Sequence, residues 1–103
     1  MTVLSICIPN FNRLDCLENC LESILISSNN VKDFKFEVCI SDNNSDQDPI
    51  NIVNKYNKKF KIIYYRNKKN LGFALNAIQT LKISTGKYAW LIGNDDLILP
   101  NTL

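Results

Sequence analysis

The stretch Gly86–Asp96 (GKYAWLIGNDD) decides the fold, because a short apolar run in it ends abruptly in an amide and two carboxylates. The run is bounded by two glycines and is rich in aromatic and branched residues, which predicts a fully buried strand rather than a helix. Ligands of an open parallel sheet bind outside the carboxyl ends of its strands. Asn94, Asp95 and Asp96 follow this strand directly, and their oxygen atoms suit Mg²⁺ or Mn²⁺. Taken alone, they are more typical of a solvated turn or of a helix N-cap with an acidic first turn.

Three further apolar runs of strand length precede this stretch, at Thr2–Ile8, Phe36–Ile40 and Lys61–Arg66. Between the runs, apolar residues recur at helical spacing and predict inward helix faces. These residues are Leu14, Leu17, Leu21, Ile24 and Leu25, then Ile52, Val53 and Tyr56, and finally Ala74, Ala77, Ile78 and Leu81. The resulting order, βαβαβαβ, predicts one α/β domain with a parallel sheet and right-handed crossovers.

Local signals suggest where each helix begins and ends. Asn12 is placed to start the first helix, which we expect to end within residues 27–30. The pair Asp48-Pro49 predicts the start of the second helix, since proline favours the first helical position. Gly86 stands where a glycine commonly ends a helix, and it predicts the end of the third.

Polar clusters follow the first, second and fourth predicted strands, at residues 12–13, 42–45 and 94–96. Gly72 and Asn76 offer a fourth contribution from the start of the third helix. These clusters can meet at one edge of the sheet if the strands lie in the order 3-2-1-4, numbered along the chain. That order also places a binding crevice between strands one and four.

Composition excludes several classes of function. The net charge is only +2 and the lysines are scattered without interleaved aromatics, so we expect no nucleic-acid partner. Four cysteines without a C-x-x-C pair, and no histidine at all, argue against a zinc site and favour thiols in a reducing cytosol. We expect neither a signal peptide nor a spanning segment. The expected location is therefore the cytoplasm, and peripheral attachment at the inner face of the membrane stays open for the full-length protein.

The first loop separates this chain from other α/β domains. Its sequence is Pro9-Asn10-Phe11-Asn12-Arg13, without the glycines of a dinucleotide-binding turn or of a phosphate-binding P-loop. A phospho-acceptor receiver domain would carry carboxylates at this position. The architecture alone does not assign a function beyond these exclusions.

Four motifs in register carry a resemblance that covers nearly the whole chain. They are Ser5–Arg13 (SICIPNFNR), Glu37–Asp46 (EVCISDNNSD), Asn70–Phe73 (NLGF) and Gly86–Asp96. In this order they resemble the family-2 glycosyltransferases of GT-A fold. The Trp-Leu-Ile-Gly-x-Asp-Asp form is most similar to the abequosyltransferase-like branch, which is associated with bacterial surface polysaccharide. The resemblance implies a Rossmann-like nucleotide-binding half.

The resemblance also implies roles for particular residues. Those expected to bind the nucleotide sugar are Pro9, Phe11, Asn12, Arg13, Asp42, Asn44, Gly72, Asn76 and Asn94, and those expected to hold Mn²⁺ or Mg²⁺ are Asp95 and Asp96. Phe11 is as consistent with a hydrophobic helix-capping contact as with stacking near the base. Asp42 resembles the carboxylate that accepts a hydrogen bond from the base, with a plain turn aspartate as the alternative.

Two positions depart from the family pattern. Gly93 replaces a first acidic residue, which puts a two-carboxylate clamp in doubt. Leu75 replaces an arginine near the pyrophosphate, so that Arg13 or a residue beyond this chain would supply that charge.

The implied function is transfer of a sugar, with inversion, from a nucleotide-sugar donor to a hydroxyl of a saccharide or lipid-linked saccharide. Residues 1–103 would be the N-terminal donor-binding part, without the acceptor-binding half. The catalytic base is expected downstream of Leu103, so we expect no activity from this chain alone. Exposed apolar surface around Trp90, Leu97 and Leu99 would favour self-association. The alternatives are a non-catalytic nucleotide or nucleotide-sugar binding module and a structural α/β domain that binds a protein.

Overall fold

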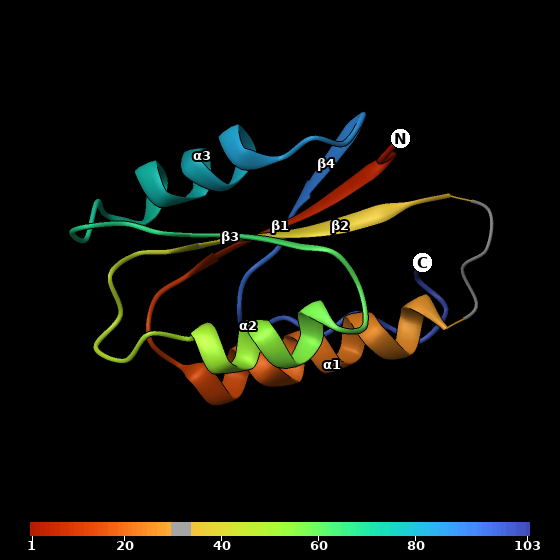
Figure 1. Cartoon of the computed structure of the whole chain (residues 1–103), viewed down its shortest axis with the longest axis horizontal. Helices are drawn as coiled ribbons and strands as arrows, with labels where there is room; N and C mark the ends of the chain where they lie inside the picture. The colour runs from red at the N-terminus through yellow and green to blue at the C-terminus, as the bar shows by residue number, and fades with distance from the viewer. Residues whose placement is uncertain (30–33) are drawn as a thin grey trace.

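The computed structural model describes residues 1–29 and 34–103, and strands and helices alternate along it as predicted. The elements are β1 (Leu4–Asn10), α1 (Leu14–Ser28), β2 (Phe36–Asp42), α2 (Ile50–Asn57), β3 (Ile62–Arg66), α3 (Phe73–Ile83) and β4 (Tyr88–Leu91). They form three layers, with α3 on one side of the sheet and α1 and α2 on the other (Figure 1). The α/β class is therefore confirmed.

All strand pairs are parallel, and the sheet has the order β3-β2-β1-β4. This confirms the predicted order 3-2-1-4. In the register of β1 and β2, Ser5 lies beside Glu37 and Asn10 beside Asp42. The carboxyl ends of all four strands consequently lie at one edge, where the polar clusters gather.

The side of the sheet that faces α1 and α2 holds the hydrophobic core. Side chains alternate along each strand, so every second residue of β1 and β2 points to this side. The fully buried members of the core are Ile6, Ile8, Leu17, Cys20, Leu21, Ile24, Val38 and Ile40, with Val53, Tyr56, Phe60 and Ile92 almost as buried. The predicted inward faces of α1 and α2 are thus confirmed except at Leu14, which is half-buried and does not belong to this core.

The opposite side of the sheet is polar. Ser5, Glu37 and Ser41 alternate with the core residues and are fully buried under α3 and the segment that follows it. Glu37 accepts hydrogen bonds from the hydroxyl of Ser5 at 2.7 Å and from the backbone N–H of Thr85 at 2.7 Å, and it pairs with Lys61 at 3.3 Å. Sequence reasoning missed this carboxylate, because its partners come from three separate segments.

The packing of α3 differs from the prediction. Asn76, Ala77 and Thr80 are its buried residues, and of the four predicted inward residues only Ala77 is among them. Ala74, Ile78 and Leu81 are exposed. The sheet surface that faces α3 is polar, and α3 lies close to it. The helix therefore directs its small and polar residues toward the sheet.

The prediction of a fully buried fourth strand is wrong. β4 lies at the end of the sheet, where within the described residues it pairs with β1 alone, and its Tyr88 side chain is 60% exposed. Gly86 does not cap α3, which ends at Ile83. A Cβ at Gly86 would lie 2.6 Å from the hydroxyl oxygen of Ser5, so this glycine permits a close approach to β1.

The predicted helix starts are also corrected. Asn12 makes no capping bond; its side-chain oxygen accepts from the N–H of Asp46, and Arg13 precedes α1 in a left-handed conformation. Asp48 does accept a hydrogen bond from the N–H of Ile50, at 3.0 Å, although α2 begins there rather than at Pro49. The first helix ends at Ser28, within the predicted range, and Asn30 lies outside the described residues.

Candidate functional site

A pocket of about 370 Å³ opens at the carboxyl edge of the sheet, between the end of β1, the residues after β4 and the start of α3. Its lining residues are Pro9, Asn10, Phe11, Asn43, Asn70, Gly72, Phe73, Asn76, Gly93, Asn94 and Asp95. Six of the eleven predicted site residues therefore meet here: Pro9, Phe11, Gly72, Asn76, Asn94 and Asp95. Pockets at this edge are the usual ligand sites of open α/β sheets.

Buried amides form the base of the pocket. Asn76 donates to the carbonyl of Ser41 at 2.9 Å, and its side-chain oxygen accepts from Asn67 at 2.8 Å. Asn43 donates to the side chain of Asn70 at 2.8 Å and accepts from the N–H of Leu71, also at 2.8 Å. These bonds fix the loop that precedes α3 against the end of β2.

The segment after β4 brings a carboxylate to the rim of the pocket. Asn94 donates to the side-chain oxygen of Asn10 at 2.8 Å, which ties this segment to β1. Asp96 turns back and accepts from the N–H of Gly93 at 2.7 Å. A Cβ at Gly93 would lie 3.0 Å from a carboxylate oxygen of Asp95, so the glycine gives the two aspartates room.

The start of α3 forms the opposite wall. Gly72 has a φ of 84°, a conformation that side chains disfavour, and a Cβ there would meet nothing within 4 Å. Among residues 1–29 and 34–103, no side chain caps this helix end. Its first N–H groups carry partial positive charge and suit an anion such as a phosphate.

Two of the predicted residues line a neighbouring hollow instead. Asn12 and Arg13 border a second pocket of about 390 Å³ together with Asp46. The guanidinium of Arg13 lies 3.7 Å from the carboxylate of Asp95, so the two pockets adjoin across this pair. Asn44 is exposed, has a φ of 63° and is not among the lining residues of the main pocket.

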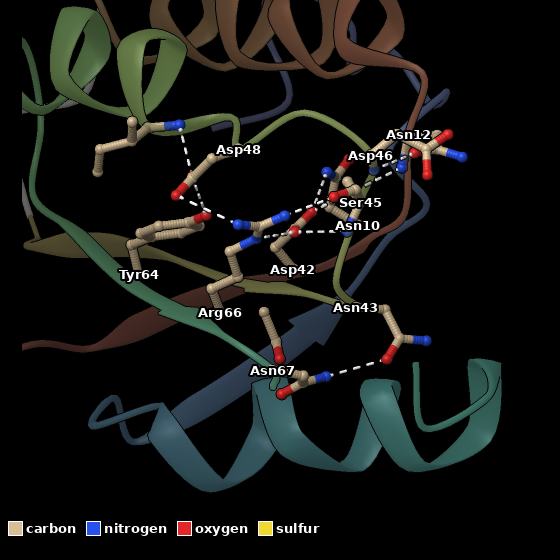
Figure 2. Close-up of polar contacts among 12 residues, drawn as sticks. Asn10, Asn12, Asp42, Asn43, Ser45, Asp46, Asp48, Tyr64, Arg66 and Asn67 are labelled. Carbon is tan, nitrogen blue, oxygen red and sulfur yellow. Dashed lines mark hydrogen bonds and ion pairs between the residues drawn. The ribbon is translucent and has the colours of Figure 1, made fainter. Parts of the chain in front are cut away.

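Asp42 lies beneath the loops rather than in the pocket lining, and it is fully buried. One carboxylate oxygen accepts from Asn10 at 2.9 Å and from the hydroxyl of Ser45 at 2.6 Å. The other accepts from the N–H of Ser45 at 3.0 Å and from Arg66 at 3.2 Å (Figure 2). Its predicted contact with a base stays a prediction, and such a contact would have to replace one of these partners.

The predicted metal site can be tested against the chemistry of its donors. In residues 1–29 and 34–103, no group of three or more histidine, cysteine, aspartate or glutamate side chains is arranged to hold a metal ion. Asp95 and Asp96 offer two carboxylates, one at the rim and one bonded to Gly93. Mg²⁺ and Mn²⁺ sites that include substrate phosphates commonly use only one or two protein carboxylates. The pair therefore fits a metal that shares its ligands with a diphosphate.

Five lining residues were not among the predicted site residues: Asn10, Asn43, Asn70, Phe73 and Gly93. Asn10 is the last residue of β1 and Asn43 directly follows β2, so their position at strand ends was an available signal. Asn70 and Phe73 flank Gly72 in the NLGF motif. Arg66 was missed as well, since its partners are distant in sequence: Asp42 at the end of β2, and Ser45 and Asp48 on the loop that follows.

Comparison with known proteins gives this arrangement a family. The family model for glycosyl transferase family 2 matches residues 5–103. The chain belongs to this family. Abequosyltransferase RfbV of Salmonella typhimurium is 37% identical over an aligned length of 105 residues, and the match covers 98% of this chain and 30% of that protein. This family-2 chain thus spans less than a third of that relative.

Solved structures share the fold. S. aureus TarS 1–349 in complex with UDP-GlcNAc has a TM-score of 0.84 and 25% identity, over 98% of this chain and 29% of that one. The mannosyltransferase PcManGT from Pyrobaculum calidifontis, in complex with GDP-Man and Mn²⁺, has a TM-score of 0.76 and 18% identity, over 91% and 28%. The parallel sheet of order 3-2-1-4 with flanking helices is therefore the Rossmann-like GT-A arrangement of family 2.

None of the helices in the described part of this family-2 chain combines the length and the apolar character needed to cross a membrane.

Proposed function

We propose that residues 1–103 form the nucleotide-sugar-binding part of a glycosyltransferase that acts with inversion on an acceptor hydroxyl, in bacterial surface polysaccharide synthesis. The observation that carries this proposal is the pocket in which Phe11, Asn94 and Asp95 meet at the carboxyl edge of the sheet, in a chain of family 2. The similarity to an abequosyltransferase supports the polysaccharide role. The four free thiols support a location in the reducing cytoplasm.

The donor would bind with its base against the first loop. The Phe11 side chain lines the pocket and is 43% exposed, which leaves ring surface for stacking. Asn94 uses its amide group to hold Asn10, and its carbonyl oxygen is the polar group we assign to a ribose hydroxyl. We assign Asn12 and Asn44, on the adjoining loops, to the outer side of the nucleotide base, although neither lines the main pocket.

The diphosphate would lie between the start of α3 and the segment after β4. Gly72 allows a close approach, and the N–H groups that follow it are donors for phosphate oxygens. Arg13 supplies the cationic side chain nearest to Asp95. Asp95, with Asp96 beside it, would hold Mn²⁺ or Mg²⁺, which supplies positive charge to stabilise the leaving diphosphate when it is bound.

We assign acceptor binding and the catalytic base to a part of the longer relatives that this chain does not match. An in-line displacement needs an acceptor hydroxyl held beside the anomeric carbon and a base within hydrogen-bond reach. The chain matches 30% of the abequosyltransferase, which leaves the greater part of that protein for these tasks. We therefore expect residues 1–103 alone to transfer no sugar to a saccharide or lipid-linked acceptor.

The test is a calorimetric titration of UDP and GDP into the wild-type chain and into Asp95→Asn, with and without Mn²⁺. We expect Asp95→Asn to lose roughly tenfold or more in the Mn²⁺-dependent affinity, since a charge-assisted contact is worth about 1.5–3 kcal/mol. Glu18→Gln is the matched control, because Glu18 is a surface carboxylate on α1 that pairs with Lys55. Equal affinity of wild type and Asp95→Asn at saturating Mn²⁺ would contradict the assignment.

A further inference from the structure

We propose that Arg66, at the end of β3, is a positioning residue that holds the first loop of the pocket in its binding conformation by way of Asp42 and Ser45. The expected effect on donor binding rests on the proposed function. The effect on loop structure does not, and it can be measured separately.

Arg66 lies beside Asp42 in the register of β2 and β3. Its Nε donates to Asp42 at 3.2 Å, its Nη2 donates to the carbonyl of Ser45, and its Nη1 lies 3.7 Å from the carboxylate of Asp48. One guanidinium therefore joins the end of β2 to both halves of the loop that follows (Figure 2). Asp48 is held in turn by the hydroxyl of Tyr64 at 2.7 Å.

The charge of Asp42 explains why this contact matters. A fully buried carboxylate is costly unless it is paired and hydrogen-bonded, and Arg66 is the cation that pairs with it. The other three donors to Asp42 are neutral: the amide of Asn10 and the hydroxyl and N–H of Ser45. Without Arg66, only neutral groups would stabilise the buried charge of Asp42. The position of Ser45, which is bonded to Asp42, would then be held less firmly.

Ser45 connects Asp42 to the first loop by hydrogen bonds. Its hydroxyl accepts a hydrogen bond from the N–H of Asn12 at 2.6 Å, while donating to Asp42. The side-chain oxygen of Asn12 accepts from the N–H of Asp46 at 2.9 Å. The two loops are thus joined by reciprocal bonds, one in each direction (Figure 2).

The first loop needs this support because its backbone is in an unfavourable region. Asn12 and Arg13 both have a φ of 52°, which residues other than glycine rarely adopt. Such conformations persist only when the surrounding structure over-determines them. The loop carries Phe11, which lines the main pocket, and Arg13, which faces Asp95. An interaction at the end of β3 therefore sets the geometry of residues that we assign to the donor.

The experiment compares Arg66→Lys, Arg66→Leu and Ser45→Ala with the control Lys68→Leu, an exposed residue two positions beyond Arg66. Amide hydrogen exchange is measured at Asn12 and Asp46, together with the affinity for UDP and GDP in the presence of Mn²⁺. Lysine keeps the charge but cannot reproduce the planar fork of contacts. We expect Arg66→Lys to keep its fold, judged by the exchange of core amides such as Ile40. We also expect it to lose at least tenfold in exchange protection at Asn12 and Asp46 and about tenfold in affinity.

Unchanged protection at Asn12 and Asp46 in the folded Arg66→Lys would overturn the inference. If Arg66→Leu fails to fold, Arg66→Lys and Ser45→Ala still decide it, because Ser45→Ala removes the link to Asn12 and leaves the Arg66–Asp42 pair in place. If the wild type binds neither nucleotide, the proposed function fails. In that case a loss of exchange protection at Asn12 and Asp46 in Arg66→Lys still supports the positioning role, and unchanged protection still overturns it.

Discussion

The side of the sheet that faces α1 and α2 is lined by Ile6, Ile8 and their neighbours on β2, whereas the side that faces α3 carries Ser5, Glu37 and Ser41. Solvent is excluded from both sides, since the two isoleucines and the three polar residues are all fully buried. Apolar contacts are not directional, so the first side contributes stability without fixing the exact place of its helices. Hydrogen bonds are directional, so the second side specifies where α3 lies.

The consequence of the difference is seen at the pocket. The polar side continues through Ser41 into Asn76, whose amide joins the end of β2 to α3. That connection holds the start of α3, with Gly72 and Phe73, as one wall of the pocket. We infer that the α1–α2 side mainly stabilises the fold and that the α3 side mainly positions the site.

The largest effect is expected from the apolar side. Leu21→Ala on α1 removes a fully buried side chain and should lower the free energy of unfolding by about 2–5 kcal/mol. Alanine favours helices, so the loss reports packing rather than helix propensity. Urea denaturation measures it, with Ile26→Ala as the control, since Ile26 is on the same helix and 46% exposed. A comparable loss in both variants would show that this side is not the main source of stability.

The next largest effect is expected from Glu37 on the polar side. Burial alone would raise the pKa of Glu37, but hydrogen bonds from Thr85 and Ser5 and the contact with Lys61 outweigh it and lower the pKa from 4.5 to about 2. A carboxylate with a lowered pKa stabilises the fold fully above its unfolded pKa, and that contribution is lost as the pH falls from 4.5 towards 2. The contribution is about 3 kcal/mol.

Glu37→Gln should therefore lose up to about 3 kcal/mol at pH 7 and flatten the decline in stability between pH 4.5 and 2. Urea denaturation across this range measures both effects. Glu18→Gln serves as the control, because its pair with Lys55 is exposed and such pairs contribute about 0–1 kcal/mol. If the decline below pH 4.5 is as steep in Glu37→Gln as in the wild type, the polar side does not depend on this carboxylate.

The sequence predicted the element order, the strand order and the meeting of Gly72 and Asn76 with the segment after the fourth strand, because these follow from patterns along the chain. An apolar run between glycines shows a strand, and a polar residue after it shows the strand's end. Parallel strands then bring their ends together whatever the details of packing. Predictions of this kind need no knowledge of distant partners.

The polar side could not be predicted in the same way. Ser5 and Glu37 are separated by 32 positions, and Thr85 lies a further 48 positions on, so nothing near Glu37 in sequence shows that its charge will be satisfied. For the same reason the inward face of α3 was misassigned, since Ile78 looks like a core residue unless the surface below is known to be polar. Arg66 was missed because its role depends on the buried charge of Asp42.

The smallest effect is expected on the outer face of α3, and it tests whether this helix is held by its polar side. Ile78 is 47% exposed and Leu81 is similarly open, so Ile78→Gln should change the free energy of unfolding by no more than about 0.5 kcal/mol. The matched variant on the same helix is Ala77→Leu. Ala77 is buried against the sheet, and overpacking there should cost about 1–3 kcal/mol.

The same pair of variants tests self-association through the outer face of α3, which is a different surface from the one around Trp90, Leu97 and Leu99 named from the sequence. Ile78→Gln removes exposed apolar surface and should weaken any association seen by sedimentation of the wild type, while Ala77→Leu should leave it unchanged in the folded fraction. A loss of more than about 1 kcal/mol in Ile78→Gln would mean that its side chain is packed, as the sequence pattern suggested. The polar contacts of Asn76 with the sheet would then not be sufficient to hold α3, and the assignment of separate roles to the two sides of the sheet would fail.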